Sequence, residues 1–414
     1  MQIFAASYLL PMAAPPLAGG AVAVADGRIV DAAPLTELKR RYSAPITNYP
    51  GCTIMPGLVN PHTHLELTHF SSWKLRKGID YSPRTYVDWV IQVIKIRRGL
   101  AREELELSIR EGVRISLEAG TTAVGEILSD RTLLPLYLGS PLGGRIFLEL
   151  LGQDPERFEA LLAGVEKSIA SFPHASFLPG LSPHAPHTVS SRLMEEAVCL
   201  AQRRALPMAV HLAESREETT FFHDTSGKIA ELLYPFADWE PYLPPPLRTT
   251  PTAHLDSLGV LGPATAVVHC VHVTPADVEI LRERGVSAVI CPRSNDRLDV
   301  GKAPVHLLRK ARIPLALGTD SLASNDSLSL WDEMRFTLHE FPGEFSPDEL
   351  LRMVTVGGAR AIGRSSDLGS LEKGKRADFL VVRLPEKTTG VALAEALIDA
   401  GELEETFVGG RKVS

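Results

Sequence analysis

The chain has 414 residues, of which 44% are hydrophobic and 22% are charged. This length and composition predict one large hydrophobic core with a smaller appended domain. The formal net charge of -7 argues against a nucleic-acid partner or an anionic membrane surface. The four cysteines are far apart, so neither a thiolate zinc site nor a disulfide framework is predicted.

The first ten residues are apolar and resemble a secretion leader only superficially. They lack a basic region, and Pro11, Pro15 and Pro16 follow them closely. No other stretch approaches the length of a membrane span. We therefore expect a soluble, cytoplasmic protein.

Both ends of the chain contain short strands around hairpin turns. Residues 21–30 include the turn sequence Asp26-Gly27. Near the other end, residues 377–383 are followed by residues 405–413, which contain the turn sequence Gly409-Gly410. Because these segments flank the central region, we expect them to meet as one small β-sandwich domain. Its expected boundaries are residues 1–53 and 364–414.

Short apolar runs alternate with helix-like segments through the central region. Eight runs have strand length and precede polar residues, proline or glycine: 57–60, 122–127, 145–150, 176–181, 207–212, 264–270, 286–291 and 313–318. The helix-like segments are 102–119, 156–172, 191–204, 275–284, 304–311 and 346–362. Eight strands alternating with helices predict an α/β fold, a (β/α)8 barrel of the TIM type, over residues 54–363.

The most informative motif is His62-Thr63-His64, which follows the first run. Alternate residues of an extended chain point the same way, so the two imidazoles can converge and form half of a metal site. Such a pair also arises by chance in a chain with 13 histidines, so its weight depends on the residues that follow downstream.

Three further candidates lie at the ends of later runs. His211 ends the fifth run, His269 ends the sixth, and Asp320 follows the eighth. Barrel enzymes place their working residues at these strand ends. A lone histidine there is more often a packing residue, but the repeated placement favours a site.

Three histidines and one aspartate make a nitrogen and oxygen ligand field that suits Zn²⁺ or Fe²⁺ and leaves a position for water. A metal in such a site lowers the pKa of that water toward neutrality. Glu214, three residues after His211, can move protons between the water and a leaving group. The alternative for Glu214 is a charge at a helix N-terminus.

The chain resembles the amidohydrolase superfamily, in its cytosine deaminase and chlorohydrolase-like branch. The matching motifs occur in the expected order through nearly the whole chain. They are residues 55–66 (MPGLVNPHTHLE), 182–186 (SPHAP), 211–214 (HLAE), 269–270 (HC), 291–295 (CPRSN), 318–325 (GTDSLASN) and 374–378 (GKRAD).

The resemblance implies a set of metal ligands and a set of catalytic residues. The implied ligands are His62, His64, His211 and Asp320. Glu214 is implied as the proton shuttle, and His269 as the residue that orients the attacking water and the tetrahedral intermediate. Asp320 is also implied to accept a proton from that water.

The number of metals also follows from the comparison with this superfamily. Related barrels with two metals bridge them through a carboxylated lysine near the end of the fourth strand. No lysine occurs here between Lys167 and Lys228. We therefore expect one divalent metal, Zn²⁺ ahead of Fe²⁺.

Three residues near strand ends are candidates for substrate binding. His184 ends the fourth run and matches a histidine that contacts the nucleoside in adenosine-type relatives, although it could also cap a helix or pack. Arg293 and Asn295 follow the seventh run and either bind substrate or hold their loop. We expect a small-molecule substrate and no nucleic-acid or membrane partner. A homo-oligomer is compatible with the resemblance, because relatives often form dimers or larger assemblies.

The resemblance implies a hydrolytic deaminase of an adenine nucleoside derivative. Candidate substrates are adenosine, methylthioadenosine, S-adenosylhomocysteine and the aminodeoxyfutalosine of menaquinone synthesis; residues 147–152 (FLELLG) are similar to the group that acts on the last. Another enzyme with the same ligands would hydrolyse a chloro- or amino-substituted triazine, or deaminate guanine or cytosine. A non-catalytic scaffold is disfavoured, because such relatives lose ligands that this chain keeps.

Overall fold

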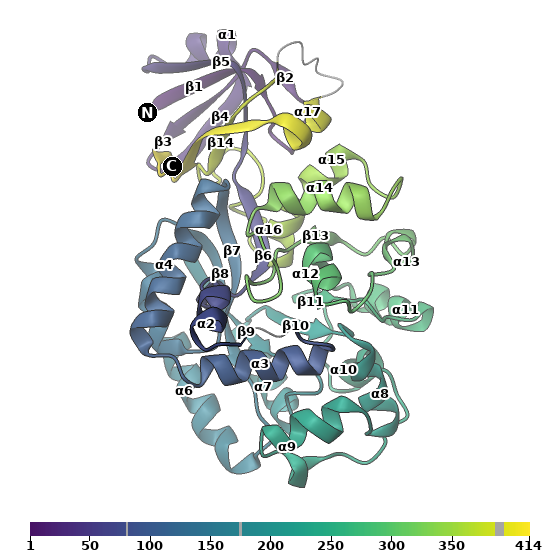
Figure 1. The fold of residues 1–414 in the computed structure, drawn as a ribbon. Helices are drawn as coiled ribbons and strands as arrows, with labels where there is room; N and C mark the ends of the chain where they lie inside the picture. The colour runs from purple at the N-terminus through teal and green to yellow at the C-terminus, as the bar shows by residue number, and fades with distance from the viewer. Residues whose placement is uncertain (80–81, 174–175, 386–392) are drawn as a thin grey trace.

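The computed structural model describes residues 1–79, 82–173, 176–385 and 393–414. Residues 386–392, which belong to the expected C-terminal part of the small domain, lie outside the described residues. A parallel barrel occupies one end of the molecule, and a sheet that contains both termini occupies the other (Figure 1).

Eight parallel strands form the barrel and are hydrogen-bonded in chain order. They are β6 (Leu58–Thr63), β7 (Thr121–Leu128), β8 (Gly143–Leu150), β9 (Phe177–Pro183), β10 (Met208–Leu212), β11 (Thr265–His269), β12 (Ser287–Ile290) and β13 (Leu315–Leu317). The backbone N–H of Asp320 donates to the carbonyl of His62 at 3.1 Å and so joins the end of the last strand to the first. The predicted barrel is confirmed, and each predicted run overlaps an observed strand.

Helices cover the outside of the barrel (Figure 1). Those after β6 are α2 (Phe70–Arg76), α3 (Tyr86–Arg97) and α4 (Arg102–Glu118). Next are α5 (Leu134–Leu138), α6 (Phe158–Ala170), α7 (Ser191–Arg204), α8 (Arg216–Asp224), α9 (Tyr234–Phe236) and α10 (Pro251–Ser257). The last are α11 (Pro275–Arg284), α12 (Pro292–Arg297), α13 (Val305–Lys310), α14 (Leu330–Glu340), α15 (Pro347–Arg352) and α16 (Gly358–Ala361).

Local sequence signals set the ends of the best-predicted helices. The Ser190 hydroxyl accepts from the backbone N–H of Leu193 and begins α7. A reciprocal cap between Thr274 and Asp277 begins α11, which ends at the left-handed Gly285. The bounds of both helices match the predicted segments.

Both termini contribute to one eight-stranded sheet. Its strands are β1 (Gln2–Leu9), β2 (Leu17–Ala18), β3 (Gly20–Ala25), β4 (Arg28–Pro34), β5 (Ile46–Pro56), β14 (Phe379–Arg383), β15 (Glu402–Val408) and β16 (Arg411–Lys412). Helices α1 (Leu35–Arg41) and α17 (Leu393–Ala400) accompany it. The rings of Phe4, Phe379 and Phe407 lie 4.4–5.1 Å apart and form its core. The small β domain built from both termini is therefore confirmed, and its strands belong to one hydrogen-bonded sheet.

Strand β5 of this sheet leads directly into β6 of the barrel through Gly57. The Gly57 N–H donates to the carbonyl of Asp378 at 3.0 Å. A Cβ at this position would lie 2.1 Å from the Thr122 hydroxyl, so only glycine fits the close approach. The junction therefore ties the start of the histidine-bearing strand to both parts of the molecule.

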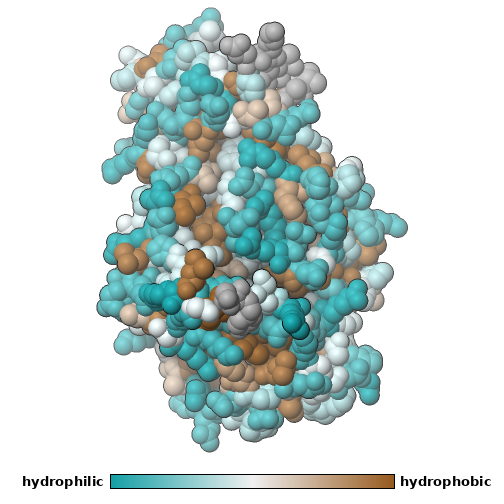
Figure 2. All heavy atoms as spheres, viewed as in Figure 1, coloured by the Kyte–Doolittle hydropathy of each residue, from teal (hydrophilic) through white to brown (hydrophobic). Residues whose placement is uncertain are grey.

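Hydrophilic residues cover most of the face seen in Figure 2, and hydrophobic residues gather there in small groups. Within the described ranges, no helix has both the length and the apolar character needed to cross a membrane.

Candidate active site

Five side chains from three barrel strands, β6, β10 and β11, and from the segments directly after β6 and β13 converge at one end of the barrel. The nitrogens of His62, His64 and His211 lie within 4.8 Å of one another, and so do the ligand atoms of His62, His269 and Asp320. One carboxylate oxygen of Asp320 lies 3.5 Å from His62 Nε2 and 3.6 Å from His64 Nε2. The structure thus brings together all the residues predicted as metal ligands.

The protonation and orientation of these histidines fit a bound cation. Both ring nitrogens of His62 are buried without a hydrogen-bond partner in the described structure. Burial lowers the pKa of His62, and it lowers that of His64 to about 3, so both rings are neutral, the form that binds metals. The Nδ1 of His211 lies 2.8 Å from the carbonyl oxygen of His184, which leaves Nε2 free for a ligand bond.

Asp320 is oriented by two serine hydroxyls. Ser294 and Ser324 donate to the same carboxylate oxygen, at 2.8 and 2.6 Å. The other oxygen is left to face His62 and His64. Burial acts to raise the pKa of Asp320, but the interactions with His62 and the other histidines hold it well below its ordinary value. The residues present therefore fit one divalent cation.

At several strand ends the backbone has the left-handed conformation, which non-glycine residues rarely adopt. Ala213 has φ of 50°, His269 of 72° and Asp320 of 57°. The carboxylate of Glu218 accepts from the backbone N–H groups of Ala213 and Glu214, both at 3.0 Å. At these three positions the strained backbone sets the direction of the side chains at the strand ends.

Glu214 and His269 lie next to the cluster. The Glu214 carboxylate is 3.7 Å from Nε2 of His269, and its side chain is only 4% exposed. Burial raises the pKa of Glu214, while His269 and a hydrogen bond from the Tyr86 hydroxyl oppose that rise. Glu214 is thus a buried carboxyl with a raised proton affinity, as a proton shuttle requires.

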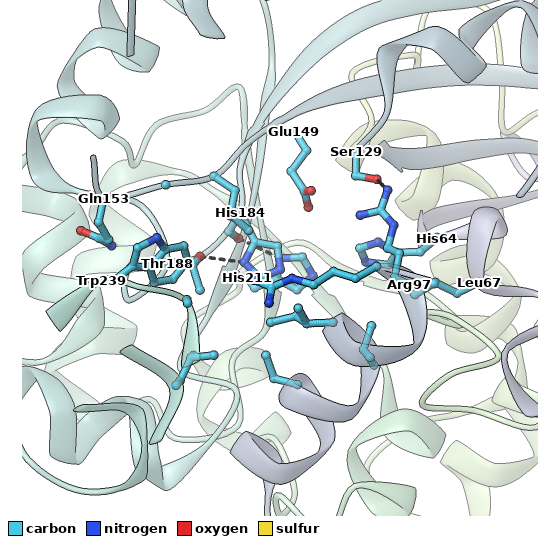
Figure 3. A pocket seen from close by; sticks show the side chains of 18 of the residues that line it. His64, Leu67, Arg97, Ser129, Glu149, Gln153, His184, Thr188, His211 and Trp239 are labelled. Atoms are coloured by element: carbon cyan, nitrogen blue, oxygen red, sulfur yellow. Dashed lines mark hydrogen bonds between the residues drawn. The ribbon is translucent and has the colours of Figure 1, made fainter. Parts of the chain in front are cut away.

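A cavity of about 720 Å³ opens over the cluster. The residues of the cluster that line it are His64, His211, Glu214, His269 and Asp320. Its walls include side chains of α3 and the ends of β7 and β8, and the proline-rich segment after α9 adds Trp239 and Tyr242. Figure 3 shows Arg97 reaching from α3 along this cavity to Ser129.

The residues predicted to bind substrate are placed differently from one another. His184 lines the cavity, and its Nδ1 is 2.8 Å from the Thr188 hydroxyl. Arg293 and Asn295 are not among the described residues that line the cavity. Arg293 pairs with Asp326, and Oδ1 of Asn295 lies 2.9 Å from Nδ1 of His269. Direct substrate contact by Arg293 and Asn295 stays a prediction.

Among the cavity residues that sequence reasoning missed are Tyr86, Arg97 and Glu149. Tyr86 and Arg97 lie on α3, a helix that the sequence patterns did not predict. The sequence does carry a signal for Glu149: it lies two residues after Phe147, and alternate residues of a strand share a face. In the structure that face points into the barrel interior, where Phe147 packs.

The fold is a (β/α)8 barrel, and one end of it holds a cluster of histidines and an aspartate that could bind a metal ion. The model of the Amidohydrolase family matches residues 53–413. The chain belongs to the amidohydrolase family.

The curated relatives and solved structures that are similar to this chain include several deaminases. The chain is 30% identical to an aminodeoxyfutalosine deaminase of Deinococcus radiodurans over 356 residues, which are 83% of this chain and 81% of that protein. It is 31% identical to a 5-methylthioadenosine/S-adenosylhomocysteine deaminase of Syntrophobacter fumaroxidans over 387 residues, 88% of this chain and 80% of that protein. An adenosine deaminase structure from Xanthomonas campestris with bound zinc is 26% identical with a TM-score of 0.81, and the match covers 99% of this chain and 92% of that one.

Proposed function

We propose that the chain is a metal-dependent hydrolytic deaminase that releases ammonia from the adenine ring of a nucleoside derivative. The observation that carries this proposal is the pairing of Glu214 with His269 beside the histidine and aspartate cluster, at the base of the cavity. Zinc is the proposed ion, and His62, His64, His211 and Asp320 would hold it. When bound, such an ion supplies the Lewis acidity that makes water nucleophilic near neutral pH.

The protein's own residues account for the proton transfers of deamination. Glu214 gives a proton to the ring nitrogen beside the carbon that bears the amine, while water attacks that carbon. The carbon gains the oxygen of water, a proton passes to the departing amine, and ammonia leaves. The burial that raises the pKa of Glu214 keeps a proton available for the first of these transfers.

His269 and His184 would position the reactants. Asn295 fixes the ring of His269 through Nδ1, so Nε2 faces the space beside Glu214, where His269 can orient the attacking water. His184 is fixed in the same way by Thr188, so its free nitrogen faces the purine.

Basic side chains on the cavity wall favour a nucleoside whose 5′ substituent carries a carboxylate. Arg98, Arg131 and Arg157 line the cavity, as do apolar side chains such as Phe158 and Trp239. Guanidinium groups bind carboxylates well. We therefore place S-adenosylhomocysteine and aminodeoxyfutalosine ahead of methylthioadenosine and adenosine as substrates. Action on aminodeoxyfutalosine would connect the chain with menaquinone synthesis.

A chloro- or alkylamino-substituted triazine is the second candidate substrate class, because it would use the same metal ligands. Glu214 favours the departure of an amine from a ring whose nitrogen must be protonated, and chloride departure has less need of that proton.

Ammonia release from a panel of purified compounds tests the proposal. The zinc-loaded protein should release ammonia from at least one adenine nucleoside derivative, and Glu214→Gln should lower kcat/KM by about 100- to 10,000-fold. Glu217→Gln, in which the exchanged side chain lies outside the cavity lining, is the matched control. Chloride release from a triazine without ammonia from any nucleoside would contradict the proposal.

A further inference from the structure

Glu149 occupies a position on the cavity wall that the deamination chemistry does not use. It is the penultimate residue of β8, two positions after Phe147, whose ring packs in the barrel interior. Because alternate residues of a strand share a face, Glu149 continues this inward face at the mouth of the barrel. Figure 3 shows it projecting into the cavity between His184 and Ser129.

Among the described residues, the carboxylate of Glu149 has no hydrogen-bond donor. In the described part of the chain it accepts no hydrogen bond and forms no ion pair, although the charge of Arg97 reaches it. Arg97 is committed elsewhere, since its guanidinium lies 3.1 Å from Glu66 and also contacts Ser129. A carboxylate enclosed in a cavity without donors is unfavourable, so this group is poised for donors that a ligand brings.

Glu149 shares its wall with the residues that would hold the purine. In the strand ladder it is paired with Ser182 of β9, and the N–H of His184 donates to the carbonyl of Leu150 at 3.0 Å. The ring of His184 in turn lies 4.6 Å from that of His211. A nucleoside whose amine-bearing carbon lies at the metal cluster would extend its sugar along this wall.

We propose that Glu149 binds the ribose of the substrate by accepting hydrogen bonds from its 2′- and 3′-hydroxyls, an inference that rests on the proposed deamination of a nucleoside. Two neighbouring hydroxyls match the two oxygens of one carboxylate. The same negative charge disfavours an anionic group at this point of the cavity. Glu149 thereby makes the enzyme selective for ribonucleosides, while the arginines of the cavity wall address the 5′ substituent.

Deoxynucleosides measure this selectivity directly. The wild-type protein, Glu149→Gln and Glu159→Gln are compared on adenosine, 2′-deoxyadenosine and 3′-deoxyadenosine by ammonia release. Glu159 is exposed on α6 and supplies the same chemical change outside the cavity lining. Zinc content and the thermal midpoint of each variant show whether it is folded.

The wild type and Glu159→Gln should prefer adenosine by about 10- to 100-fold in kcat/KM. Glu149→Gln should lose most of this preference, because adenosine has two hydrogen bonds to the carboxylate to lose and each deoxynucleoside has only one. An equal fall on all three substrates, or no wild-type preference, would overturn the role of Glu149 and leave deamination standing. Absence of ammonia from every adenine nucleoside derivative would instead overturn the proposed function.

Discussion

The amide oxygen of Asn295 lies 2.9 Å from Nδ1 of His269, on the side of the imidazole that faces away from Glu214. An amide oxygen only accepts, so this contact places the ring proton on Nδ1 and leaves Nε2 bare. Among the described residues, Nε2 has no hydrogen-bond partner, and it lies 3.7 Å from Glu214. In the proposed reaction, Asn295 would therefore act through His269.

Replacing Asn295 tests this positioning role. Asn295→Ala should lower kcat by about 10- to 100-fold with little change in KM, because the ring of His269 loses its fixed orientation. Asn295→Asp keeps an acceptor at the same place and should recover part of the loss. Steady-state kinetics separate this role from direct substrate binding, which would instead show as a rise in KM.

The Tyr86 hydroxyl connects α3 with the proposed proton shuttle. Tyr86→Phe removes its hydrogen bond to Glu214 and should lower kcat about tenfold, because the carboxyl is less firmly held. The control is Tyr137→Phe, in which a buried tyrosine loses a bond of 2.5 Å to Glu126 outside the cavity lining. Equal kcat in the two variants would show that the Tyr86 contact is structural only.

The raised pKa of Glu218 leads us to expect a specific dependence of stability on pH. Burial raises the pKa of Glu218 from 4.5 to about 8. Below pH 4.5 both folded and unfolded chains hold this proton. Between 4.5 and about 8 only the folded chain does, so each pH unit lowers the free energy of unfolding by about 1.4 kcal/mol.

Glu218→Gln removes this titration. The thermal midpoint of the variant minus that of the wild type should rise as the pH increases from about 5 to about 8. Glu333→Gln is an independent comparison, since burial raises the pKa of Glu333 to about 8 as well. A difference that stays constant across this range would show that Glu218 titrates normally in the folded protein.

Removal of the metal should change stability as well as activity. Dialysis against a chelator should abolish ammonia release and lower the thermal midpoint, and zinc should restore both. At 100 times its dissociation constant, an ion that binds only the folded state adds about 2.7 kcal/mol to the free energy of unfolding. His211→Asn, which removes a proposed ligand, should show little zinc-dependent change in midpoint; a full zinc response would exclude His211 as a ligand.

The barrel could be predicted because each of its strands is a short apolar run with clear punctuation. His62, His211, His269 and Asp320 could be placed together because parallel strands end at the same face. Strand β1 is not predicted, because the apolar run Gln2–Leu9 also resembles a secretion leader. Its partner β5 lies more than thirty residues away, and a single sequence does not show that pairing.

The cavity wall was harder to predict than the metal cluster. Tyr86 and Arg97 lie on a helix whose periodicity is that of ordinary packing, and nothing local shows that this helix covers the site. Asn295 was recognised as part of a motif, but its contact with His269 depends on the left-handed backbone of His269. Such conformations are set by tertiary packing, so the sequence alone could not assign the role.

The position of β5 also bears on the order in which the protein matures. This strand leads into His62 and is hydrogen-bonded to β1 on one side and to β14 on the other. A ribosome makes β14 and β15 only after every barrel strand has been synthesised. The nascent chain can therefore assemble its barrel while one edge of β5 is still unpaired, and that edge is closed only after β14 has been made.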